Sequence, residues 1–306
     1  MLNIFIDGNN IEKKENASSC VVLGDCLSVL KNMRSSSVDL IFADPPYGIG
    51  KDFGVTKDTF ANIDEYMIWC KAWIDECMRI LKPKGTMYFM SSTQFMPALD
   101  RYVDETYFVI NRIVWVYDSS GVQPKSKFGS LYEPIIMMTH DKNVGYTFNY
   151  RDIMVEAKTG AERGLIDYRK TPPQPYSAMK IPGNVWEFSR VRFKMGEYEN
   201  HPTQKPEALL ERIIMASSNK GDIVLDPFSG SFTTSAVAVR LGRKAIGIDI
   251  NPEYYKIGLR RTGVTSEYDG KALCQDKSRK TKNKSKNDHY NDFEQVALEY
   301  GLGAAE

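Results

Sequence analysis

The chain has 306 residues, of which 42% are hydrophobic and 26% charged, and its formal net charge is +1. This composition is that of a globular protein, so it excludes a chain that is disordered over most of its length. No apolar run is long enough to span a membrane, and no membrane association is expected. Because the charges balance, a nucleic-acid partner has to be argued from local features.

The cysteine and histidine pattern argues against a metal or disulfide framework. No C-x-x-C pair occurs among the five cysteines, which favours reduced thiols: Cys20, Cys26, Cys70, Cys77 and Cys274. Cys70 and Cys77 fall on the apolar face of a predicted helix and are expected in the core. His140 and His289 are too scattered for a metal site, so none is predicted. The first residues lack the features of a secretory signal, and we expect a cytoplasmic protein.

The first half of the chain reads as alternating strands and helices. Residues 38–43 form a short apolar run that is typical of a buried parallel strand. Apolar residues spaced by three and four predict an amphipathic helix over 64–81, ended by Pro83. Strands are then expected at 86–90 and 108–117.

A second βα region lies near the other end. A helix is expected between Pro206 and Gly221, in agreement with the preference for proline at helix starts and glycine beyond helix ends. Strand 222–226, helix 232–241 and strand 244–249 follow. Their lengths match a βαβ unit that binds a nucleotide.

The segment between these halves, 118–199, has no regular periodicity, as is typical of functional loops. Its basic side chains are either contacts for phosphates and base edges or members of a solvated loop: Lys125, Lys127, Arg151, Arg163, Arg169, Arg190 and Arg192. Residues 271–286 contain seven basic residues and one acidic residue. They predict a flexible basic tail that either adds salt-dependent affinity for nucleic acid or keeps the chain in solution.

Asp44-Pro45-Pro46-Tyr47 is the sharpest chemical signal. An exocyclic amino group on a nucleobase is a poor nucleophile, because its lone pair is delocalised into the ring. Asp44 offers a carboxylate, and the prolines offer carbonyl oxygens with no competing N–H. Tyr47 adds a flat face for stacking on a base. The motif therefore suits an amino group that must be held by acceptors, although an ordinary turn after a strand would look the same.

The turn at 226–231, with Asp249, is either a nucleoside site or a tight turn between a strand and a helix next to an unrelated aspartate. Small residues between a strand and a helix let the backbone approach a ligand and aim helix N–H groups at it. The turn is not G-x-G-x-x-G, which disfavours a dinucleotide and favours a nucleoside without phosphates. Asp249 ends the next strand, where an acidic residue binds ribose hydroxyls.

Four elements in this order resemble the permuted, β-class S-adenosylmethionine-dependent DNA adenine-N6 methyltransferases. They are L-G-D-C at 23–26, D-P-P-Y at 44–47, H-P-T-Q-K-P at 201–206 and D-P-F-S-G-S at 226–231. Segments 114–121 and 197–200 are similar to the stand-alone YhdJ-type enzymes, so no obligate nuclease partner is expected. The resemblance covers about residues 21–261.

The resemblance implies an α/β, Rossmann-like fold with a circularly permuted sheet and S-adenosylmethionine as cofactor. The cofactor-binding residues that it implies are Asp25, Cys26, His201, Thr203, Gln204, Lys205, Asp226, Pro227, Phe228, Gly230, Ser231 and Asp249. The catalytic residues that it implies are Asp44, Pro45, Pro46 and Tyr47. The domain boundaries become 1–117 for the catalytic half, 118–199 for an inserted target-recognition region, 200–262 for the cofactor half and 263–306 for the tail.

The implied reaction flips an adenine out of duplex DNA and methylates its N6. Asp44 and the Pro45 carbonyl would hold the amino group while Tyr47 stacks on the base; Trp115 either lines the base pocket or belongs to the core. Cytosine-N4 methylation is the main alternative, with RNA adenine or protein glutamine methylation further off, and a catalytically silent DNA-binding regulator is an alternative of another class. The family is often dimeric, and a homodimer would suit a palindromic target in the nucleoid.

Overall fold

The structure is a computed structural model that describes residues 11–51, 58–118, 125–157 and 163–265. Met1–Asp269 form one compact unit and Gly270–Glu306 a second. The predicted basic tail, with Cys274 and His289, lies outside the described residues.

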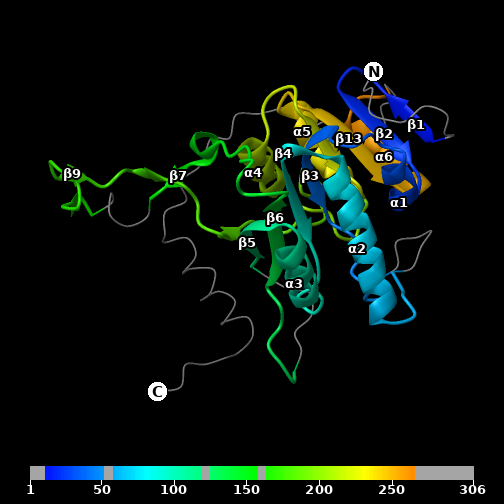
Figure 1. Cartoon of the computed structure of the whole chain (residues 1–306), viewed down its shortest axis with the longest axis horizontal. Helices are drawn as coiled ribbons and strands as arrows, with labels where there is room; N and C mark the ends of the chain where they lie inside the picture. The colour runs from blue at the N-terminus through cyan, green and yellow to red at the C-terminus, as the bar shows by residue number, and fades with distance from the viewer. Residues whose placement is uncertain (1–10, 52–57, 119–124, 158–162, 266–306) are drawn as a thin grey trace. The chain divides into compact units, whose positions relative to one another are not determined.

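A nine-stranded sheet forms the centre of the first unit, in the order β1-β2-β13-β12-β3-β4-β6-β5-β11 (Figure 1). The strands from β2 to β4 in this order are parallel, whereas β6 is antiparallel to both of its neighbours. Because the late strands β12 and β13 lie between the early strands β2 and β3, the expectation of a permuted Rossmann-like sheet is confirmed. The bounds are β1 Glu12–Glu15, β2 Ser19–Leu23, β3 Val38–Ala43, β4 Leu81–Met90, β5 Phe108–Val116, β6 Tyr132–Thr139, β11 Val185–Glu187, β12 Ile223–Asp226 and β13 Lys244–Asp249.

Helices cover both faces of this sheet. Side chains alternate along β3, so that Ile41 and Ala43 pack in one core cluster with α2, while Leu40 and Phe42 pack in another with α4 and α5. The two-sided burial explains why the strand reads as an unbroken apolar run. The helices are α1 Cys26–Lys31, α2 Ile63–Ile80, α3 Met96–Thr106, α4 Glu207–Ser217, α5 Thr233–Arg240 and α6 Pro252–Arg261.

The predicted helix and strand around Pro83 differ from the structure at their junction. Asn62 caps α2 by accepting a hydrogen bond from the Glu65 N–H, and the helix ends at Ile80. β4 begins directly at Leu81, five residues before the predicted start, so Pro83 lies inside it. The ladder with β3 shifts register between Val38 and Leu40, which accommodates the proline.

The prediction that 118–199 is irregular is wrong for β6, which lies inside the sheet between β4 and β5. Pro134 hid this strand, because a proline inside an apolar run argues against a central strand. Its pairing with β4 runs from Ile135 to Met138 and leaves Pro134 without a partner on that side. β11, also within 118–199, extends the same sheet beside β5.

The remainder of that segment is built from short elements, as expected. A 3-10 helix, η1 (Tyr150–Ile153), is followed by two small hairpins. These pair β7 (Val155–Glu156) with β10 (Met179–Lys180), and β8 (Ile166–Asp167) with β9 (Gln174–Pro175). Among the described residues, the helices are all too short or too polar to cross a bilayer.

The sheet directs its functional loops to one edge. The carboxyl ends of the parallel strands β2, β13, β12 and β3 meet there, as in other open α/β sheets that bind ligands. Because β6 runs the opposite way, its amino end reaches the same edge. Loops from distant parts of the sequence therefore face a common space.

Candidate active site

A cavity of about 450 Å³ lies at this edge of the sheet. Its wall contains the turn after β3, the loop before α4 and the turn after β12. Asp25 and Cys26 after β2, and Asp249 at the end of β13, complete it. All the residues predicted from sequence as catalytic or cofactor-binding thus line one cavity.

The carboxylate of Asp44 is fixed by two side chains. Lys205 Nζ lies 2.5 Å from Asp44 Oδ2, and the Tyr47 hydroxyl donates to Oδ1 at 2.6 Å. A fourth group, Glu133 at the amino end of β6, places Oε2 3.1 Å from the Tyr47 hydroxyl and 3.5 Å from Lys205 Nζ. Lys205, Asp44 and Glu133 are 8%, 17% and 18% exposed. In this shielded setting the interactions are stronger than at the surface.

The electrostatics fix the protonation of two members of this cluster. Burial lowers the pKa of Lys205, but the two carboxylates outweigh it and the pKa is raised overall, so the ammonium persists. Burial, followed by Asp44 and Glu133, raises the pKa of Tyr47 well above its usual range. Tyr47 therefore stays a hydrogen-bond donor at neutral pH.

Asp58 shapes the turn that follows the prolines. Its carboxylate, in a residue that is 4% exposed, accepts the backbone N–H groups of Tyr47 at 3.1 Å, Gly48 at 2.6 Å and Ile49 at 3.2 Å. Gly48 adopts φ +69°, which favours glycine. Three charge-assisted bonds hold the turn in place beneath the Asp44 cluster.

The turn after β12 is built around Asp226. This buried carboxyl accepts the Thr234 hydroxyl at 2.5 Å and the Phe228 N–H at 3.0 Å. Next to it, Gly230 has φ +50° and donates its N–H to Asp249 Oδ2 at 2.8 Å. A Cβ on Gly230 would lie 2.7 Å from His201 Nε2, so the close approach of these two loops requires glycine.

Two of the predicted cofactor residues, Asp25 and Asp249, also accept hydrogen bonds from the protein's own backbone. Asp25 caps α1 by accepting the Ser28 N–H and hydroxyl at 2.9 and 2.8 Å. Cys26 is 7% exposed, and burial raises the pKa of its thiol, which stays neutral. Asp249 accepts the Asn251 N–H at 2.8 Å with its second oxygen.

Some side chains of the loop before α4 reach into the cavity, and others bind backbone groups inside the protein. The His201 ring packs against Tyr254 with 4.6 Å between ring centroids, and burial, then Lys205, lower its pKa to about 3, so it stays neutral. Gln204 turns to the backbone, accepting the Glu199 N–H at 2.7 Å and donating to the Glu197 carbonyl at 2.5 Å. Lys205 reaches the Asp44 carboxylate, a contact that the sequence did not indicate.

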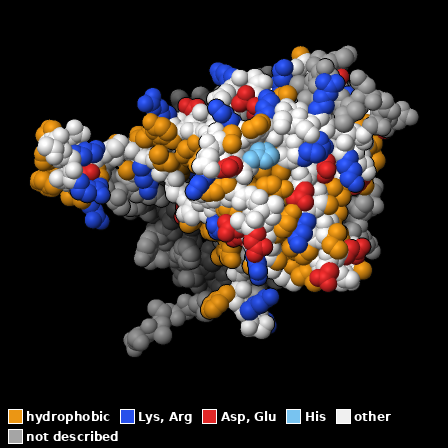
Figure 2. Space-filling view, in the orientation of Figure 1, with side chains coloured by type: hydrophobic (Ala, Val, Ile, Leu, Met, Phe, Trp, Pro, Cys, Tyr) orange, Lys and Arg blue, Asp and Glu red, His pale blue; other side chains and the backbone are white. Residues whose placement is uncertain are grey.

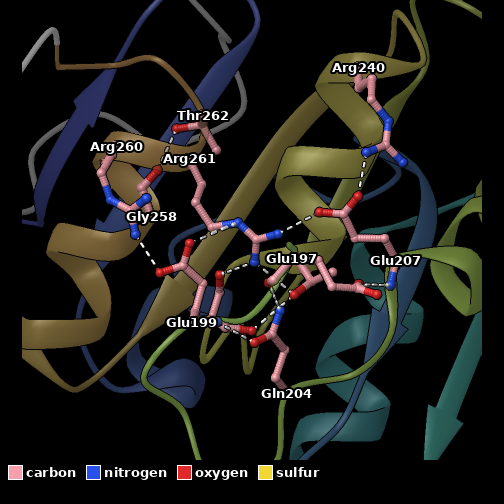
Figure 3. A network of polar contacts seen from close by, with 11 residues as sticks. Glu197, Glu199, Gln204, Glu207, Arg240, Gly258, Arg260, Arg261 and Thr262 are labelled. Atoms are coloured by element: carbon pink, nitrogen blue, oxygen red, sulfur yellow. Dashed lines mark hydrogen bonds and ion pairs between the residues drawn. The ribbon is translucent and has the colours of Figure 1, made fainter. Parts of the chain in front are cut away.

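An ionic network anchors this loop to the last helices (Figure 3). Glu199 pairs with Arg260, and Glu207 pairs with Arg261 at 2.8 Å and with Arg240. Arg261, 8% exposed, also donates to the Ser231 carbonyl at 2.7 Å. The network ties the loop before α4 to the turn after β12, the two loops that flank the cavity.

Sequence reasoning missed several residues of the cavity wall. These are Lys51, Asp58, Glu133 and Arg190. Arg190 was considered as a DNA contact, but the others carry no local motif. Glu133 could have been found from its position just before the apolar run 135–138, but Pro134 argued against a strand there.

The proposed nucleic-acid contacts differ in their surroundings. Trp115 is 1% exposed and donates its indole N–H to the Phe188 carbonyl at 2.9 Å, so it belongs to the core. Apart from Arg190, the basic candidates of 118–199 are exposed. Figure 2 shows basic and hydrophobic side chains together on the hairpins, where Arg169 lies in the cation-π range of Tyr176 and Tyr168 is 79% exposed. Within the described ranges, no three His, Cys, Asp or Glu side chains are arranged to hold a metal ion.

Comparisons with known proteins agree on one family. The model of a family described as DNA methylase matches residues 38–260. The chain is 58% identical over 271 residues to DNA adenine methyltransferase YhdJ of Escherichia coli (strain K12), covering 89% of this chain and 92% of that protein. It is 38% identical to type II methyltransferase M.HpaI of Haemophilus parainfluenzae, covering 82% and 75% of the two chains. In fold it is similar to the PvuII DNA methyltransferase (cytosine-N4-specific), with a TM-score of 0.63 at 19% identity over 95% of this chain and 97% of that one.

Proposed function

Because this chain belongs to the DNA methylase family, we propose that it is an enzyme that methylates N6 of adenine in duplex DNA with S-adenosylmethionine. The relative at 58% identity, which carries the name adenine methyltransferase, supports adenine over cytosine. One observation supports the proposal most directly. The carboxylate of Asp44 is held in place by Lys205 and Tyr47, and it lines the same cavity as the carboxyls of Asp226 and Asp249.

The cavity wall fits the cofactor. Gly230 permits the turn after β12 to come against His201, and the carboxyls of Asp226 and Asp249 lie at the ends of adjacent strands. We assign Asp249 to the ribose hydroxyls, and His201 and Thr203 to the methionine part. When bound, S-adenosylmethionine supplies an electrophilic methyl group on a sulfonium. The turn carries no pyrophosphate fingerprint, in keeping with a cofactor that lacks phosphates.

Asp44 holds the amino group of the target base. A carboxylate has about four acceptor sites, and Lys205 and Tyr47 use two of them. The remaining lone pairs, with the Pro45 carbonyl, accept the N6 hydrogens and draw the nitrogen toward tetrahedral geometry. Fixed acceptors of this kind act where positive charge develops on the amino group.

Replacing Asp44 tests this role. We expect Asp44→Ala to slow methyl transfer by at least about 10²-fold, the scale of losing one preorganised electrostatic group. Cofactor affinity measured by calorimetry should stay within a few fold, because Asp44 faces the base. Asp64→Ala, an exposed residue in the first turn of α2, is the matched control and should keep full activity. Wild-type turnover by Asp44→Ala would contradict the assignment.

The product identifies the base. Mass spectrometry of nucleosides from methylated duplex DNA should find N6-methyladenine. N4-methylcytosine would point to the alternative chemistry, which also needs acceptors for an amino group. Cofactor binding without any methylated nucleoside would point to a silent DNA-binding regulator.

Recognition of the target is assigned to the part of 118–199 that lies outside the sheet strands β6 and β11. Its exposed Lys and Arg side chains suit phosphates and base edges. We propose that the chain works without a nuclease partner, associates with the nucleoid through its substrate, and forms a homodimer on a palindromic site. Light scattering with and without DNA would measure the dimer.

A further inference from the structure

The Tyr47 hydroxyl lies between two carboxylates but has one proton. Its oxygen is 2.6 Å from Asp44 Oδ1 and 3.1 Å from Glu133 Oε2. A hydroxyl donates one hydrogen bond and accepts others. Both contacts become hydrogen bonds at the same time when Glu133 or Asp44 carries a proton of its own. The cluster therefore has a place for one additional proton.

The charges around the cluster favour taking up that proton for a short time. Asp44 and Glu133 contribute two negative charges, and Lys205 contributes one positive charge between them. The remaining negative charge makes the cluster a proton acceptor. Lys51 and Arg190 line the same cavity, and the charge of Glu133 also acts on Tyr117. These outer positive charges favour release of the proton afterwards.

The reaction proposed above releases one proton at this place. As the N6 lone pair forms the new N–C bond, the C–S bond breaks and its electron pair stays on sulfur. N6 then has one proton more than the neutral product. Asp44, which holds N6, is the first acceptor, and its other oxygen is paired with Lys205.

Resting on that proposed function, we infer that Glu133 takes up the N6 proton through the Tyr47 hydroxyl. When Asp44 receives the proton from N6, the Tyr47 hydroxyl turns its own proton from Asp44 toward Glu133 and accepts a hydrogen bond from Asp44. The Asp44 proton then moves to the Tyr47 oxygen as the Tyr47 proton moves to Glu133, so that Glu133 ends protonated and Asp44 ionised. Glu133, at 18% side-chain exposure, returns it to solvent. Glu133 is thus a positioning residue that acts through Tyr47, and Tyr47 has a task besides stacking.

Glu133→Gln tests the relay with little change of shape. The amide oxygen still accepts from Tyr47 and Lys205, but the side chain takes up no proton. We expect the single-turnover rate on duplex DNA to fall about 10²-fold, the lower range for a lost acid-base group, with cofactor affinity unchanged. Glu133→Asp should recover part of the rate. Glu105→Gln, on the exposed face of α3, is the matched control and should match the wild type.

The pH profile and a double variant separate proton transfer from simple packing. With the cofactor saturating at every pH, the wild-type rate should fall toward acid pH, and Glu133→Gln should not show this fall. Because Tyr47 and Glu133 act in series, Tyr47→Phe with Glu133→Gln should be no slower than Tyr47→Phe alone. If the rate losses of the two single variants multiplied in the double variant, Tyr47 and Glu133 would not act in one proton pathway.

An infrared measurement reads the proton site without catalysis. In the unliganded protein, lowering the pH should produce a protonated-carboxyl band that Glu133→Gln removes and Glu105→Gln keeps. A wild-type rate in Glu133→Gln at every pH, or a joint loss of rate and cofactor affinity that Glu133→Asp does not relieve, would overturn the relay alone. If the wild type methylates no adenine, the proposed function fails, and the infrared band still decides whether Glu133 takes a proton.

Discussion

Burial raises the pKa of two carboxyl groups in the cavity wall, Asp226 to about 7 and Asp249 to about 6. Hydrogen bonds that favour the ionised form partly offset both increases in pKa. Asp226 accepts one from the Thr234 hydroxyl, and Asp249 accepts them from backbone N–H groups. Raised values of this kind are typical of functional sites, since a stable fold does not need buried carboxyls. A ligand that donates hydrogen bonds to them would favour their ionised forms.

Cofactor affinity should therefore depend on pH through Asp249. Ribose hydroxyls donate to a carboxylate more strongly than to a neutral carboxyl, so affinity is present above the pKa of about 6 and is lost as the pH falls through it. Calorimetry should give a dissociation constant about tenfold higher at pH 5 than at pH 8, since about one carboxyl in ten is ionised one unit below its pKa. Asp249→Asn should bind weakly and lose this part of the pH dependence. An unchanged affinity in that variant would assign the carboxylate to structure.

At the scale of elements, one aromatic ring sets the turn that leads into α5. Phe232 is fully buried at φ +56°, a left-handed conformation that is strained for a bulky residue. Its ring lies against two glycines, because a Cβ on Gly247 of β13 or on Gly258 of α6 would come within 2.5 Å or 2.7 Å of ring atoms. The glycines let the ring fill this space, and its packing holds the turn.

Gly247→Ala should disturb this turn. The added methyl would meet both the Phe232 ring and Ser229 Oγ, at 2.6 Å, and both side chains are buried, which limits relaxation. We expect the free energy of unfolding to fall by about 1–3 kcal/mol, as is usual for overpacking, and cofactor affinity to fall with it. Gly183→Ala is the matched control, because a Cβ there has no neighbour within 4 Å. Denaturant titration would compare the two variants, and equal midpoints would contradict the packing argument.

At the scale of the whole molecule, the charge of the chain is arranged in blocks. Residues 271–286 carry seven basic groups and one acidic group, whereas 287–306 carry five acidic groups and no Lys or Arg. The near-neutral total hides both blocks. A basic block adds affinity for any DNA by releasing counterions, and this part of the affinity declines with salt.

Replacing the basic residues of 271–286 by glutamine should weaken binding of non-target duplex DNA more at low salt than at high salt. The plot of log affinity against log salt should become shallower by several units, at about 0.9 for each lost phosphate contact. Replacement of the acidic residues of 287–306 by the amides is the matched control and should not flatten the plot. Equal affinities at every salt concentration would show that the basic block does not contact DNA.

The sequence by itself determined the fold class, the strands β3, β4, β5, β12 and β13, the helices α2, α4 and α5, and the motif residues that line the cavity. Motifs such as 44–47 and 226–231 each follow a strand, and parallel strands end at a common edge, so local signals were sufficient to bring them together. The tertiary structure decided the pairing of Lys205 with Asp44 and the arrival of Glu133 through β6. The first contact joins residues 161 positions apart in the chain, and the second joins residues 86 positions apart. The second also depends on an antiparallel strand that contains a proline and was therefore not expected. Local periodicity carries no information about such pairs, because they depend on which strands become neighbours in the sheet.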